Sequence, residues 1–236
     1  MKGIYKIADK VILIDSIFSA IHNMCKDYAF SGEPEIEISV TEADIERERG
    51  MPVESGVKEP TDRYLETLAV YRKLSVELLR YDTFLFHGSA VELDGETYLF
   101  TAVSGTGKST HTRLWRELYG TRAVMINDDK PLIRIDGDRA TVFGTPWNGK
   151  HKLGTNKSSH LKAVCILERG TENKIIPISR EAAFATLFTQ TYRPDDPIKM
   201  GKTLELVDRL SRSVGLYKLE CNMDIDAARV SYEGMK

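Results

Sequence analysis

Residues 101–110 have the composition and spacing of a loop that binds phosphate groups. The segment reads TAVSGTGKST and matches the phosphate-loop pattern G-x-x-x-x-G-K-[ST] except at the first glycine, where Ala102 stands. Gly105 and Gly107 can adopt positive φ angles, so the turn can expose a concave row of backbone N–H donors. A helix is expected to begin here, and a helix N-terminus favours an anion. The sequence therefore predicts a phosphate site.

The side chains of this loop suit a complex of Mg²⁺ with a nucleoside triphosphate. Lys108 can reach the outer phosphates, and the Ser109 hydroxyl can be a ligand of the Mg²⁺ that accompanies them. The alternative is a turn of small residues that joins a strand to a helix. We expect ATP or another nucleoside triphosphate, with Mg²⁺, to bind through the loop residues Ser104, Gly105, Thr106, Gly107, Lys108, Ser109 and Thr110.

Two adjacent carboxylates, Asp128 and Asp129, follow an apolar stretch further along the chain. Neighbouring side chains on extended backbone point to opposite sides, so the two are expected to differ in role. One can hold Mg²⁺, directly or through water, and the other can accept the proton of an attacking hydroxyl. The alternative is a simple Asp-Asp turn before Pro131.

Three motifs occur in the order and spacing of HPr kinase/phosphorylase and its smaller relatives: His87-Gly88, Ser104–Ser109 and Asp128-Asp129. The chain resembles that family over roughly residues 84–168, and the superfamily includes the ATP-type phosphoenolpyruvate carboxykinases. The resemblance implies an active histidine, a loop lysine, a metal-binding serine and a proton-transferring aspartate. These roles fall on His87, Lys108, Ser109 and Asp129, and we assign Asp128 to the metal.

Two features of the family are not matched. Its later metal-binding glutamate, in a glutamate–arginine–glycine context, has no clear match, and Gly144–Lys150 occupies that part of the chain. Its late catalytic arginine is unassigned, and Lys150 or Arg193 is a candidate for supplying that charge. Lys150 is equally well explained as a solvated loop lysine. Phosphorylase activity and HPr as the substrate are therefore not expected.

The elements around the loop predict the fold class. Hairpins are expected on both sides of it, the first joining Phe84–Leu93 to Thr97–Val103 through Asp94-Gly95. The sheet should therefore be mixed, unlike the parallel sheet of an ordinary P-loop ATPase. We expect an α/β fold, with a mixed-sheet P-loop kinase core of the HPr kinase C-terminal type in residues 81–236.

Further strands are expected at Ala123–Ile126, Leu132–Ile135, Ala140–Phe143, Ala163–Leu167 and Ile175–Ile178. Helices are expected from the loop to Gly120 and at Glu181–Tyr192, Pro197–Ser213 and Ile225–Gly234.

Residues 1–80 carry no recognisable chemistry. They predict a small α/β appendage that recognises the acceptor or packs on the core. Its expected parts are strands at Ile4–Ala8, Val11–Ile14 and Ile36–Val40, a helix capped by Ser16, a helix opened by a Thr41 capping box, a loop at Gly50–Pro60, and a helix from Thr61 or Asp62.

The composition excludes several classes of protein. In 236 residues the net charge is −2, and 42% of the residues are hydrophobic. Nucleic-acid binding and membrane insertion are therefore not expected. Three distant cysteines predict reduced thiols and a cytoplasmic location. Trp147 is expected to cover the core, whereas the surface is expected to carry His111, His151 and His160.

The sequence thus predicts a Mg²⁺-dependent kinase that transfers phosphate to a Ser/Thr hydroxyl of a small protein or peptide. The alternatives are free serine or another small alcohol as acceptor, a nucleotide-binding regulator without turnover, and a carboxykinase-like lyase. The chain is short for the lyase, and no cluster suits Mn²⁺ and oxaloacetate. Family members often assemble, so a homo-oligomer is expected by analogy.

Overall fold

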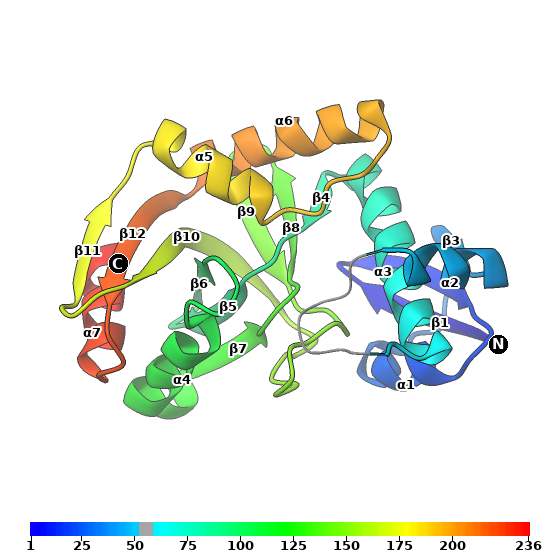
Figure 1. The fold of residues 1–236 in the computed structure, drawn as a ribbon, viewed down its shortest axis with the longest axis horizontal. Helices are drawn as coiled ribbons and strands as arrows, with labels where there is room; N and C mark the ends of the chain where they lie inside the picture. The colour runs from blue at the N-terminus through cyan, green and yellow to red at the C-terminus, as the bar shows by residue number, and fades with distance from the viewer. Residues whose placement is uncertain (52–58) are drawn as a thin grey trace. The chain divides into compact units, whose positions relative to one another are not determined.

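The structure is a computed structural model that describes residues 1–51 and 59–236. The chain divides into two compact units, Met1–Leu78 and Leu79–Lys236 (Figure 1). The sequence placed the division after residue 80, within the short 3-10 helix η2 (Leu79–Tyr81). The loop predicted at Gly50–Pro60 lies largely outside the described residues.

The first unit combines a small sheet with three α-helices among its described residues. In the sheet, β1 runs antiparallel to β2, and β3 lies parallel to β2. The chain reverses between β1 and β2 at Ala8 and Asp9, whose φ angles are 49° and 59°. The elements are β1 (Lys2–Ile7), β2 (Lys10–Asp15), α1 (Ala20–Met24), η1 (Lys26–Tyr28), β3 (Ile36–Ser39), α2 (Glu42–Arg49) and α3 (Asp62–Leu78).

The predicted helix starts of this unit are partly confirmed. Before α2, the Asp44 carboxylate accepts hydrogen bonds from the Thr41 backbone N–H and hydroxyl, both at 2.9 Å, as expected for a capping box. The cap at Ser16 is wrong, because α1 begins only at Ala20. The Ser16 hydroxyl instead donates to the Phe18 carbonyl and contacts His22 Nε2.

The second unit, residues 79–236, contains the candidate site. Its strands form one mixed sheet in the order β4-β8-β9-β10-β6-β5-β7, with β12 beside β10 and β11 beside β12. The elements after η2 are β4 (Thr83–Leu85), β5 (Ser89–Leu93), β6 (Glu96–Thr101), α4 (Lys108–Tyr119), η3 (Gly120–Arg122), β7 (Ala123–Asn127), β8 (Leu132–Asp136), β9 (Arg139–Phe143), β10 (Ser158–Arg169), β11 (Lys174–Pro177), α5 (Arg180–Thr189), α6 (Pro197–Ser213), β12 (Gly215–Cys221) and α7 (Asp226–Met235).

The mixed sheet is confirmed. The strand β10 lies parallel to β6 and β12, whereas β5 and β6 form the predicted antiparallel hairpin. That hairpin turns at Asp94 and Gly95, whose φ angles are 56° and 86°. Both residues are therefore left-handed, as a tight hairpin turn requires.

Two parts of the sheet differ from the prediction. The single strand expected at Phe84–Leu93 is wrong, because β4 pairs with β8 while β5 pairs with β6 and β7. The chain crosses between them at 86–88, where His87 N–H donates to the Gln190 carbonyl and Gly88 N–H to the Asp129 carbonyl. The strand β12, which the sequence analysis did not identify, lies parallel to β10.

Helices cover both faces of this sheet. Neighbouring residues of one strand alternate between two apolar clusters, so that Leu99 belongs to the cluster with α5 and α6, and Phe100 to the cluster with α4 and α7. Figure 1 shows α6 and α4 on opposite sides of the sheet. Within residues 1–51 and 59–236, every helix is too short or too polar to cross a bilayer.

Candidate active site

The loop between β6 and α4 has the backbone that the sequence predicts for a phosphate site. The φ angles of Gly105 and Gly107 are 82° and 129°, and a Cβ at either residue would meet nothing within 4 Å. Glycine is therefore required by the backbone angle rather than by space. Ala102 stands where the phosphate-loop pattern has its first glycine. The structure explains this difference, because Ala102 is 1% exposed and packs in the core below the loop.

Lys108 begins α4 and lies partly buried above this core. Its Nζ donates a long hydrogen bond of 3.4 Å to the Ala102 carbonyl. Burial lowers the pKa of Lys108, while the nearby Asp129 carboxylate raises it and the Lys130 ammonium lowers it. Lys108 and Asp129 therefore lie close enough to interact, as the predicted mechanism requires.

The two neighbouring aspartates have different partners. Asp128 is 6% exposed, and its Oδ1 accepts a hydrogen bond from the Gly149 N–H at 2.8 Å. Asp129 lies between His87 and Lys130, with Oδ1 3.3 Å from His87 Nε2 and Oδ2 2.5 Å from Lys130 Nζ. Burial raises the pKa of Asp129, but the hydrogen bonds and charges of His87 and Lys130 outweigh it and lower the pKa to about 2.

Asn127 fixes the backbone that carries both aspartates. Its side chain is fully buried, and Oδ1 accepts hydrogen bonds from the N–H groups of Asp129 and Lys130 at 2.9 and 2.6 Å. Its Nδ2 donates to Thr145 Oγ1 and Asn148 Oδ1, which belong to the loop after β9. Sequence reasoning missed this residue, although an asparagine at a strand end is a known turn-forming signal.

A cavity of about 230 Å³ brings Ser109 together with Asp128, and it is also lined by Arg113, Arg116 and His151. A hydroxyl and one carboxylate fit Mg²⁺, which prefers oxygen ligands and usually completes its shell with phosphate oxygens and water. The described residues contain no group of three or more His, Cys, Asp or Glu that could hold a metal. Ser109 and Asp128 can therefore hold Mg²⁺ only together with further oxygen ligands that a bound nucleotide supplies.

Lys150 and Arg193 do not join this cluster. Lys150 is exposed and makes no hydrogen bond within the described part of the chain. It adjoins the site only through Gly149, whose N–H is bound by Asp128. Arg193 Nη1 donates to the Thr189 carbonyl at 2.9 Å, at the end of α5. Neither side chain supplies a positive charge to the aspartates in this structure.

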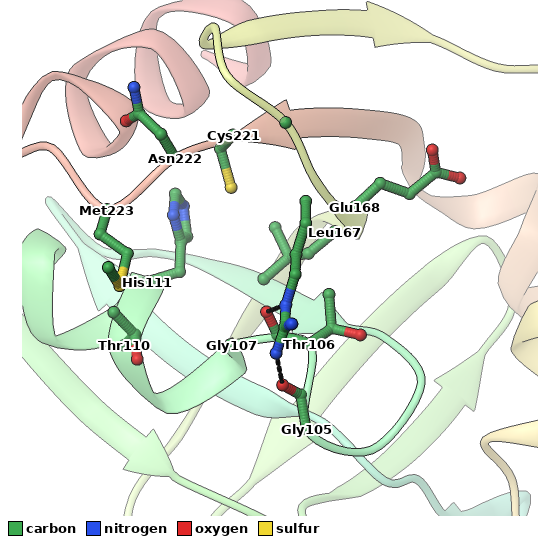
Figure 2. Close-up of a pocket in the computed structure, with 12 residues that line it drawn as sticks. Gly105, Thr106, Gly107, Thr110, His111, Leu167, Glu168, Cys221, Asn222 and Met223 are labelled. Carbon is green, nitrogen blue, oxygen red and sulfur yellow. Dashed lines mark hydrogen bonds between the residues drawn. The ribbon is translucent and has the colours of Figure 1, made fainter.

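The sequence analysis was wrong to find no glutamate–arginine–glycine segment. Glu168, Arg169 and Gly170 stand consecutively where β10 ends. Arg169 Nη2 donates to the Gly105 carbonyl at 2.6 Å, and its Nε to the Thr106 carbonyl at 3.4 Å. The Glu168 carboxylate pairs with Lys218 of β12, and Figure 2 shows it pointing away from the loop. The arginine, and not the glutamate, therefore contacts the phosphate loop.

The surface position expected for His111 is also wrong. The side chain is 2% exposed, and its Nε2 lies 3.2 Å from Trp115 Nε1 and 3.1 Å from Ser231 Oγ. Burial lowers the pKa of His111 to about 3. His151 is exposed as expected, and Trp147 is buried in the core as expected. His160 is half-buried beside Glu96.

The comparisons with known proteins identify a family. A family model described as "SynChlorMet cassette protein ScmC" matches residues 57–195, which is more than half of the chain. The chain therefore belongs to this family. No curated protein matches it.

Among solved structures, the chain is similar to the HPr(Ser) kinase/phosphatase from Coxiella burnetii. The identity is 10%, the TM-score is 0.32, and the match covers 63% of this chain and 94% of that chain. This is a distant similarity, too low to support an argument about activity. The mixed α/β fold and the site geometry therefore rest on the structure described above.

Proposed function

We propose that the protein is a Mg²⁺-dependent kinase that transfers phosphate from a nucleoside triphosphate, ATP first, to the hydroxyl of a serine or threonine in a small protein or peptide. The observation that carries this proposal is the convergence of three features in residues 79–236. These are the positive-φ loop at the start of α4, the cavity shared by Ser109 and Asp128, and Asp129 close to Lys108.

The binding roles follow from the arrangement of these groups. The Thr106 N–H donates to the Val103 carbonyl at 3.1 Å within the turn. The other backbone N–H groups of the loop would hold the phosphates, and Lys108 would neutralise the outer ones. Ser109 and Asp128 would hold Mg²⁺, which when bound supplies positive charge to the phosphate oxygens. Arg169 holds the loop through the carbonyls of Gly105 and Thr106.

In the transfer step, Asp129 takes the proton of the acceptor hydroxyl. The hydroxyl oxygen forms a bond to the terminal phosphorus, and the bond between that phosphorus and the bridging oxygen of the nucleoside diphosphate breaks. The hydroxyl proton passes to Asp129, which is ionised at neutral pH because its pKa is about 2. His87, 3.3 Å from Asp129 Oδ1, orients this carboxylate and can relay the proton onward.

One observation favours a second candidate, a nucleotide-binding regulator without turnover. Both Asp129 oxygens already have a partner, His87 or Lys130, and a carboxylate with a pKa near 2 is a weak base. Such a protein would bind Mg·ATP as tightly as a kinase does and form no ADP. A free serine or another small alcohol remains the alternative acceptor for the kinase.

The test measures the transfer of labelled γ-phosphate from ATP. The full chain is incubated with Mg²⁺ and a cell extract of its source, with free serine in a parallel reaction, and with Lys108→Ala as the inactive control. A labelled protein or peptide that is absent with Lys108→Ala supports the proposal. Tight Mg·ATP binding with neither labelled product nor ADP would instead establish the regulator, and no nucleotide binding would contradict both.

A further inference from the structure

A second cavity adjoins the phosphate loop on the side away from Asp128. It has a volume of about 500 Å³, within the range of small-molecule sites. Its walls come from the loop and the start of α4, from the end of β10, and from residues 221–223, where β12 ends. Figure 2 shows the Cys221 sulfur pointing toward the loop and Met223 beside His111 and Thr110, whereas the Asn222 side chain points away from the loop. We call it the β10–β12 cavity.

The wall after β12 is fixed by hydrogen bonds. Asn222 N–H donates to Asn173 Oδ1 at 3.0 Å, and its Nδ2 donates to the Thr171 carbonyl at 3.1 Å. Its Oδ1 accepts the Asp224 N–H at 2.9 Å. Met223 is therefore held in place although its side chain is 77% exposed. An exposed apolar side chain on a fixed wall is suited to contact a ligand.

One residue of the cavity wall has a buried ring nitrogen without a hydrogen-bond partner. His111, which lines it, is 2% exposed, and only its Nε2 is engaged, by Trp115 and Ser231. Its Nδ1 has no hydrogen-bond partner within the part of the chain that the structure describes. Buried polar atoms are nearly always paired, so this one indicates a group that the protein alone does not supply. A nucleobase presents both donors and acceptors on its edges and would satisfy either tautomer of the ring.

The position of the cavity along the loop identifies the end of the nucleotide that faces it. In a phosphate loop the backbone N–H groups hold the α- and β-phosphates, while the lysine reaches the β- and γ-phosphates. The β10–β12 cavity is bordered by Gly105–Gly107 and Thr110, whereas Ser109 lines the other cavity with Asp128. The phosphoryl-accepting side, with His87 and Asp129, is thus separate from it. The nucleoside end of the chain of phosphates therefore points into the β10–β12 cavity.

We propose that the β10–β12 cavity binds the nucleoside of the phosphate donor, with the base between Leu167 and Met223 and in reach of His111. The inference rests on the proposed function, because it requires that the loop binds phosphates. It adds that the protein selects a nucleotide rather than a bare polyphosphate. The apolar wall and the His111 ring, and not the loop, supply that selection.

Calorimetry with the full chain distinguishes nucleoside binding in the β10–β12 cavity from phosphate binding by the loop. The probes are the Mg²⁺ complexes of ATP, GTP and inorganic tripolyphosphate. We expect the preferred nucleotide to bind at least tenfold more tightly than tripolyphosphate, and Met223→Ser to reduce that advantage several-fold. The matched control is Ile225→Ser, two positions further on and 44% exposed, which should change neither affinity. Equal affinities for all three probes would overturn the inference and leave the phosphate site standing.

A labelling experiment reports on the cavity directly. Met223→Cys and the control Ile225→Cys are made in a chain with Cys221→Ser, since Cys25 and Cys165 are buried. The preferred nucleotide should slow the reaction of Met223→Cys with a thiol reagent at least tenfold, and tripolyphosphate should not. No protection at 223 by a bound nucleotide would overturn the inference. If neither tripolyphosphate nor a nucleotide binds, the proposed function itself fails, which is a different result.

Discussion

Replacing Asp129 by asparagine removes the carboxylate that faces both His87 and Lys130 while keeping its shape. The folded-state pKa of Asp129 is about 2, and an ordinary aspartate has a pKa of about 3.9. A shift of this size corresponds to about 2 kcal/mol of stability at neutral pH. We therefore expect the unfolding free energy of Asp129→Asn at pH 7 to be lower by about that amount.

The pH dependence of this difference has a definite sign. Because folding lowers the pKa, the stabilisation is present above the unfolded-state value of about 4 and is lost as the pH falls toward the folded-state value of about 2. The stabilities of the wild type and Asp129→Asn should therefore converge in acid. Urea denaturation in EDTA, at pH values from 7 down to 3, measures this. A gap that persists unchanged at pH 3 would contradict the assigned ion pairs.

The same substitution should slow transfer much more than it weakens binding. Loss of a general base costs ~10²–10⁴ in rate, and the affinity for Mg·ATP should change by less than about tenfold, or 1.4 kcal/mol. The matched control is Asp128→Asn, whose amide oxygen can still accept the Gly149 N–H. That variant should raise the Mg²⁺ requirement more than it slows the metal-saturated reaction.

A magnesium titration of the transfer rate distinguishes the two aspartates. If excess Mg²⁺ rescues Asp129→Asn but not Asp128→Asn, the two roles are reversed. If neither substitution slows transfer, the base lies elsewhere, and His87 is the next candidate.

Three further predictions concern the framework of the site. Asn127→Ala leaves several buried groups without partners and should lower the unfolding free energy by about 2–4 kcal/mol, at about 1–3 kcal/mol per unsatisfied group, as measured by urea denaturation. Asp82 binds Lys202 and Arg209; burial raises its pKa, but these hydrogen bonds outweigh it and lower the pKa. Asp82→Asn should therefore cost under about 1 kcal/mol for a partly exposed pair, a difference that disappears in acid as Asp82 becomes protonated. A chain that starts at Leu79 should keep Mg·ATP affinity in calorimetry and lose labelled-phosphate transfer; retained transfer would show that residues 1–78 do not recognise the acceptor.

The parts of the site that sequence reasoning could reach are those with local signals. Gly105 and Gly107 were identified because only a positive φ explains glycines at that spacing before a helix. Different surroundings for Asp128 and Asp129 were predicted from alternation along extended backbone. Their partners do differ, but β7 ends at Asn127 and both residues lie in the bend that follows it. The hairpin at Asp94-Gly95 and the start of α6 at Pro197 are likewise fixed by a few neighbouring residues.

The missed features depend on contacts between residues far apart in the chain. The strand β12 follows α6 without a turn signal, and it is fixed as a strand by pairing with β10. His111 is polar and sits near the exposed loop, but Trp115 and α7 bury it through Ser231. The role of Arg169 was hidden because the predicted strand stopped at Leu167, before the residues that reach the loop. Contacts of this kind, between residues far apart in the chain, leave no periodic pattern in the sequence.

The central claim is that residues 101–110 bind the phosphates of a nucleotide. Its most direct test is a calorimetric titration of Mg·ATP into the full chain and into Lys108→Ala. The only hydrogen bond of Lys108 Nζ within the described residues is the 3.4 Å bond to Ala102, so the fold should be unchanged by circular dichroism. We predict that Mg·ATP binds the wild type and that Lys108→Ala weakens binding by about 10–100-fold, the equivalent of a charged hydrogen bond of about 1.5–3 kcal/mol. The exposed Lys174 serves as control, and Lys174→Ala should bind as the wild type does. Equal affinity of Lys108→Ala and the wild type would show that residues 101–110 are not a phosphate site.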